Sequence, residues 1–63
     1  MRQVTKDDFY AAMGPLNVHP TITNDKWPYT SDWMVGRVVV GRTVGRLEGP
    51  FERKDYYLAE ARA

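Results

Sequence analysis

The chain has 63 residues, of which 27% are charged and 43% are hydrophobic, and it contains no cysteine. This length suits one compact domain spanning residues 1–63, and the missing cysteines exclude disulfide bonds and thiolate metal sites. The composition is that of a folded protein rather than a disordered one. No apolar run reaches the length of a membrane span or a signal-peptide core, so we expect a cytoplasmic protein without a membrane partner. We also expect a monomer.

The net charge is +1, but the two signs are unevenly distributed along the chain. Residues 1–35 hold three basic and four acidic side chains, whereas residues 36–63 hold six basic and four acidic ones. This segregation predicts a domain with an acidic side and a basic side.

Residues 5–16 carry the signals of a short N-terminal helix. Thr5 is a candidate N-cap, and the carboxylate of Asp8, three residues later, favours the positive end of the helix dipole. Gly14 and Pro15 then supply a stop. The apolar residues between these signals recur at the spacing of one helical face, which consists of Phe9, Ala12, Met13 and Leu16.

The middle of the chain predicts a small antiparallel sheet. Residues 21–23 form a short β-branched strand, and a longer hairpin follows with a turn at Gly36-Arg37, because glycine in first place suits a type II′ turn. The strands are then residues 30–35 and 38–47, with Gly41 or Gly45 as a candidate bulge. The cross-strand pairs of this register are Val35 with Val38, Trp33 with Val40 and Ser31 with Arg42.

A turn at Gly41-Arg42 is the rival for this hairpin. It would set Arg37 directly opposite Arg46, a like-charge pair that costs up to ~1 kcal/mol. The sequence therefore favours the turn at Gly36-Arg37.

The last segment predicts a short C-terminal helix that begins at Gly49-Pro50, because proline in the first helical turn loses no needed hydrogen bond. Its apolar face would hold Tyr57, Leu58 and Ala61, although residues 55–59 also suit a strand. The predicted fold class is α+β, with a small antiparallel β-sheet flanked by a short N-terminal helix and a short C-terminal helix.

Catalytic and metal-binding motifs are weak in this sequence. His19 is the only histidine, and the carboxylates of Asp7, Asp8, Asp25 and Asp32 lack the spacing of an EF-hand or a phosphate loop. Ser31 is the only serine and has no base or nucleophile-elbow pattern around it. We therefore expect a protein that is not an enzyme and that needs no cofactor or metal.

Two groups of residues suggest binding instead. Trp27, Tyr29 and Trp33 lie within seven residues; we expect Trp33 in the core and Trp27, in a loop before Pro28, at the surface. The second group is Arg37, Arg42 and Arg46, which have no acid between them and could contact nucleic-acid phosphates. A pI of about 8.1 and eight acidic residues weigh against that second interpretation.

Three stretches of the chain carry a resemblance to a known family, namely KDDFYAAMGPL at residues 6–16, TNDKWPYTSDW at residues 23–33 and GRVVVGRTVGR at residues 36–46. Together with the short, cysteine-free, single-domain organisation, they make the chain resemble the small phage-encoded anti-CRISPR proteins, in particular those directed at type I-C systems. The resemblance covers the full length and includes no diagnostic motif.

The resemblance implies a non-catalytic inhibitor that binds a subunit of a CRISPR-Cas surveillance complex in the host cytoplasm and blocks target DNA binding. Carboxylates facing a lysine- and arginine-lined groove would gain from the charge complementarity that steers DNA there. In such a protein, phosphates would be imitated by Asp7, Asp8, Asp25 and Asp32, with Trp27 and Tyr29 as anchors. The alternative is a small nucleic-acid-binding or regulatory domain that uses Arg37, Arg42 and Arg46.

Overall fold

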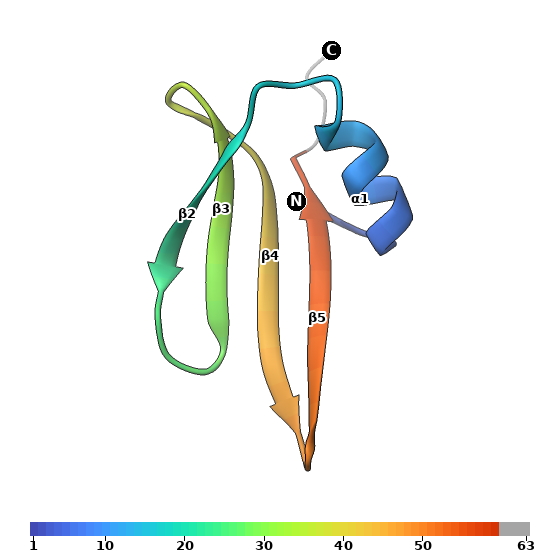
Figure 1. The fold of residues 1–63 in the computed structure, drawn as a ribbon, viewed down its shortest axis with the longest axis vertical. Coiled ribbons are helices and arrows are strands. Elements are labelled where there is room, and N and C mark those ends of the chain that lie inside the picture. Colours follow the sequence, from blue (N-terminus) through green and yellow to red (C-terminus); the bar gives the residue numbers. More distant parts are fainter. Residues whose placement is uncertain (60–63) are drawn as a thin grey trace.

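A computed structural model describes residues 1–59 of the chain. These residues form one α-helix and five β-strands in the order β1, α1, β2, β3, β4, β5 (Figure 1). The elements are β1 (Arg2–Val4), α1 (Lys6–Met13), β2 (His19–Asn24), β3 (Tyr29–Val35), β4 (Val38–Glu48) and β5 (Phe51–Leu58).

All five strands belong to one sheet with the order β1-β5-β4-β3-β2, and every neighbouring pair is antiparallel. The molecule is 39 Å long, whereas a helix of eight residues spans only about 12 Å. Helix α1 lies beside the end of β5 that pairs with β1, and the strands extend well beyond it (Figure 1). Within residues 1–59, much of the sheet therefore has no helix over it.

The predicted N-terminal helix is confirmed, including its first residue. The backbone N–H of Asp8 donates to Oγ1 of Thr5 over 3.1 Å, and the N–H of Gly14 donates to the carbonyl of Tyr10. Phe9 and Met13 are buried against the sheet, while Leu16 lies beyond the helix and is partly exposed.

Four aromatic rings make up the centre of the core. The ring of Phe9, which is fully buried, lies 5.4 Å from that of Trp33 and 5.3 Å from that of Tyr56, and Tyr10 packs against the outer side of this group. The indole N–H of Trp33 donates to Oγ1 of Thr43 over 3.2 Å. Trp33 is therefore a structural residue, as predicted.

The hairpin turn at Gly36-Arg37 is also confirmed, but the register beyond it differs from the prediction. Val35 pairs with Val38, and Gly36 has a φ of +60°, as glycine in the first turn position allows. A bulge at Val40 then shifts the strands, so that Trp33 pairs with Gly41 and Ser31 pairs with Thr43 rather than with Arg42.

The bulge has a physical reason in the packing of α1. A Cβ atom at Gly41 would lie 2.8 Å from Cε1 of Phe9 and 2.9 Å from Cε of Met13, so only glycine leaves room for the helix at this point. The shift also sets Arg42 opposite Asp32, which gives that strand pair a cross-strand ion pair.

The predicted C-terminal helix is wrong for the described residues. Residues 51–58 form β5, and Gly49-Pro50 is the two-residue turn of a hairpin in which Glu48 pairs with Phe51. Gly49 has a φ of +57°, which a turn requires and a helix start does not. Residues 51–58 form a strand rather than a helix because they pair with β4 along their whole length and with β1 at their end. Ala61, which belongs to the predicted helix, lies outside the described residues.

Candidate functional site

The sheet presents two different faces, because successive side chains of a strand point to opposite sides. Positions 41, 43, 45 and 47 of β4 lie on the side that carries α1, which we call the helix-side face. Positions 42, 44, 46 and 48 lie on the other side, which we call the open face. Residues that pair across the strands share a face, so the register assigns the other strands as well.

Large apolar side chains lie on the part of the helix-side face that α1 does not cover. Tyr29 pairs with Gly45, and a Cβ atom at Gly45 would lie 3.6 Å from the ring of Trp27 and 4.0 Å from Cβ of Tyr29. Leu47 lies on the same side of β4, and Ile22 of β2 pairs with Ser31 on this side. We call this group the apolar patch: Ile22, Trp27, Tyr29 and Leu47, all between 42% and 68% exposed.

Trp27 is held in place although it lies in a loop. Its ring packs against that of Tyr29 with a centroid distance of 4.5 Å and an interplanar angle of 68°. The side chain of Asn24 braces the loop, donating to the carbonyl of Pro28 over 2.9 Å and accepting from the backbone N–H of Lys26 over 3.3 Å. The patch is therefore largely preorganised, which reduces the entropy lost on binding.

The open face carries a network of ion pairs. Nε of Arg42 lies 2.6 Å from Oδ1 of Asp32. Asp55 accepts from two arginines, with Nη2 of Arg46 at 3.0 Å and Nε of Arg53 at 3.3 Å. Two further contacts extend the network, from Arg53 to Glu48 at 3.2 Å and from Gln3 to Asp55 at 3.4 Å.

Two carboxylates of this network, those of Asp32 and Asp55, lie beneath the guanidinium groups. The side chains of Asp55 and Asp32 are only 8% and 14% exposed, whereas those of Arg42, Arg46 and Arg53 are 42–56% exposed. The hydrogen bond to Asp32 raises the pKa of Arg42, and the hydrogen bond to Glu48 raises the pKa of Arg53. Both guanidinium groups are charged at neutral pH, as arginine is in general, and they lie between the nearly buried carboxylates and the solvent.

Asp55 compensates an unfavourable cross-strand pair. Arg46 and Arg53 lie directly opposite each other in β4 and β5, and like charges in that position are destabilising. We expect Asp55→Asn to lower the free energy of unfolding by about 1–2 kcal/mol, because the amide keeps the shape but loses the charge between two half-exposed arginines. Urea denaturation followed by circular dichroism measures the change.

The matched control for that variant is Glu48→Gln, since Glu48 is 59% exposed and its ion pair with Arg53 lies at the surface. This control should change stability by less than about 0.5 kcal/mol. Equal stability of the two variants would contradict the role of Asp55 between the arginines.

The structure separates the four predicted acidic residues. Asp7 and Asp8 lie exposed in the first turn of α1, and Asp25 lies in the loop between β2 and β3. Asp32 lies on the open face and is paired with Arg42. These four carboxylates do not form one patch, whereas Trp27 and Tyr29 do come together.

The three predicted arginines are also divided. Arg42 and Arg46 share the open face, while Arg37 lies in the exposed turn between β3 and β4. Sequence reasoning missed Arg53, Asp55, Ile22 and Leu47. Had residues 51–58 been predicted as a strand paired with β4, Arg53 and Asp55 would have been placed on one face of it. The pairing of β5 with β4 puts that face on the side of Arg42 and Arg46.

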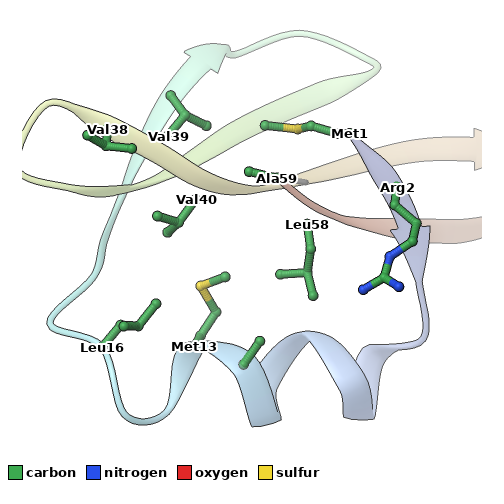
Figure 2. A pocket seen from close by; sticks show the side chains of 10 residues that line it. Met1, Arg2, Met13, Leu16, Val38, Val39, Val40, Leu58 and Ala59 are labelled. Atoms are coloured by element: carbon green, nitrogen blue, oxygen red, sulfur yellow. The ribbon is translucent and has the colours of Figure 1, made fainter. Parts of the chain in front are cut away.

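An apolar groove of about 1240 Å³ lies between α1 and the sheet (Figure 2). Met13 and Leu58 point into it, and Arg2 is the charged residue along its lining. The described lining contains no serine, histidine or carboxylate side chain. The lining residues are Met1, Arg2, Ala12, Met13, Leu16, Val38, Val39, Val40, Leu58 and Ala59.

Within residues 1–59, no group of three or more histidine or acidic side chains is placed to hold a metal ion, and His19 is exposed in β2. The helix of this part of the chain is too short and too polar to cross a membrane. The chain matches no protein-family model, and no curated protein or solved structure matches it.

Proposed function

We propose that this protein is a non-catalytic inhibitor that binds another protein through the apolar patch. The observation that carries the proposal is the gathering of Ile22, Trp27, Tyr29 and Leu47 on the uncovered part of the helix-side face. Following the resemblance of the sequence to anti-CRISPR proteins, the partner is a subunit of a type I-C Cas effector. The inhibitor then blocks target DNA binding by occupying the surface or groove that DNA needs.

Interface physics supports the choice of this patch. Tryptophan and tyrosine are the side chains most often found at the energetic centre of protein interfaces, and contiguous exposed apolar surface commonly marks a binding site. A domain whose described core has only Phe9 and Met13 as buried hydrophobic residues leaves unusually large side chains outside it. Docking would remove those side chains from water.

Charge has a secondary part in this proposal. Asp25 is the predicted acidic residue next to Trp27, and Glu52 lies on the same face as the patch, with its carboxylate near Gly45. Lys26 and Lys54 lie in the same region, so the rim is of mixed sign. The apolar patch supplies the affinity, and the rim charges set the orientation of the partner.

Binding to separately purified type I-C effector subunits tests the proposal, with affinity measured by biolayer interferometry. We expect Trp27→Ala to weaken binding by at least about ten-fold, because truncating a central aromatic anchor typically costs more than 1.4 kcal/mol. Tyr29→Ala should act in the same direction.

The control variant is Val38→Ala, since Val38 is 63% exposed but lies at the turn between β3 and β4, away from the patch. It should bind as the unaltered protein does. If the protein bound none of the subunits, the proposal of a Cas partner would be wrong. If Trp27→Ala and Val38→Ala lost the same amount of affinity, the apolar patch would not be the binding surface.

A further inference from the structure

The open face holds three guanidinium groups with unused hydrogen-bond donors. Arg42 uses two of its five N–H groups on Asp32, and Arg46 makes one contact of 3.0 Å with Asp55. The carboxylates that fix these arginines are themselves nearly buried. An anion approaching this face therefore meets oriented guanidinium groups, whose side chains are already ordered.

Two aromatic side chains lie on the same face as these arginines. Phe51 lies two residues before Arg53 in β5, and Tyr57 lies two residues after Asp55, so both rings point to the open side, about 20 Å apart along the strand. Phe51 is 72% exposed.

Each aromatic ring has a guanidinium neighbour. Tyr57 pairs directly with Arg42, and Phe51 lies two residues from Arg53 on the same side of β5. Proteins bind single-stranded nucleic acid by stacking its bases on aromatic rings and by contacting its phosphates with basic side chains. The open face has both kinds of side chain next to each other.

We propose that the open face binds single-stranded nucleic acid, with Arg42, Arg46 and Arg53 on the phosphates and with Phe51 and Tyr57 stacking on bases. This surface is separate from the apolar patch on the other face, and the inference does not rest on the proposed function. The proposed surface includes Arg42 and Arg46 of the nucleic-acid-binding alternative predicted from the sequence, and it contains Arg53 instead of Arg37.

The chemistry of the face favours a single strand over the other polyanions. An acidic peptide would satisfy the arginines but would leave Phe51 without a partner, and duplex DNA keeps its bases stacked inside and unavailable to an aromatic ring. The ionised groups of the face also balance, since Arg42, Arg46 and Arg53 are matched by Asp32, Asp55 and Glu48. We therefore expect modest affinity, with a logarithmic salt slope of about −2 for three phosphate contacts on a single strand.

Fluorescence anisotropy with a labelled oligonucleotide of about 12 nucleotides tests this inference on the full chain at several salt concentrations. Phe51→Ala should weaken binding about ten-fold, because it removes one stacking platform from an exposed position. Arg53→Gln should reduce the magnitude of the salt slope by about 0.7, the share of one phosphate contact.

The matched control is Val38→Ala, an exposed apolar side chain at the turn between β3 and β4, which should bind the oligonucleotide as the unaltered protein does. Circular dichroism melting of each variant verifies that it is folded. No binding at low salt would overturn the inference, as would unchanged affinity in Phe51→Ala. Tighter binding of the corresponding duplex, or equal competition by polyglutamate, would overturn it in favour of a different polyanion.

Discussion

Replacing Phe9 by alanine should lower the free energy of unfolding by about 3–5 kcal/mol, which is the usual cost of deleting a buried phenyl ring. Phe9 is fully buried and contacts the rings of Tyr10, Trp33 and Tyr56, so its loss leaves a cavity under α1. A domain of this size has a total stability of only about 3–9 kcal/mol. We therefore expect Phe9→Ala to be largely unfolded at 37 °C, as measured by thermal denaturation with far-ultraviolet circular dichroism.

Phe51→Ala is the control that separates burial from residue type. It removes the same ring from a position that is 72% exposed, and it should change stability by less than about 0.5 kcal/mol. Similar denaturation midpoints for the two variants would contradict a core centred on Phe9.

Features with a local cause were predictable from the sequence. The Thr5 cap and the glycine-first turn at Gly36 each depend on residues within one helical or hairpin turn, and both are present. Residues 51–58 were assigned to the wrong element because their local pattern allows helix or strand. Their pairing with β4, which lies next to them only after the turn at Gly49-Pro50, decides for the strand.

The surfaces were less predictable than the elements, because they depend on register. Trp27 and Tyr29 were identified through their proximity in sequence, and their rings do pack together. Their apolar companions Ile22 and Leu47 come from other strands and carry no local signal. The predicted acidic residues do not gather, because two of them lie in α1, one lies in the loop between β2 and β3, and Asp32 lies on the open face of β3.

The bulge at Val40 shows how tertiary packing selects a register. A regular hairpin would place Val40 opposite Trp33, beneath the aromatic ring of Phe9, whereas the bulge brings Gly41 to that place. The absence of a side chain at one residue of β4 thus allows α1 to approach the sheet. This requirement involves residues 9 and 41, which are distant in sequence, so no local pattern reveals it.

Gly41→Ala should consequently lower the free energy of unfolding by about 3 kcal/mol, near the upper end of the cost of overpacking. The added Cβ atom would lie 2.8 Å from the rigid ring of Phe9, 2.9 Å from Met13 and 3.2 Å from the carbonyl oxygen of Tyr57. Met13 can move its terminal methyl group, but the ring and the backbone oxygen cannot both yield without shifting α1 or β5. Urea denaturation measures the loss.

Gly45→Ala is the matched control, because Gly45 lies on the same face of the same strand. Its added Cβ atom would be 3.5 Å from Glu52 and 3.6 Å from Trp27, which are ordinary contact distances, and its φ is not in the left-handed region. This variant should be at least as stable as the unaltered protein, since alanine reduces the entropy of the unfolded chain. A similar loss in both variants would mean that the sheet requires glycine for its own curvature, and the close approach of α1 at Gly41 would then not be the cause.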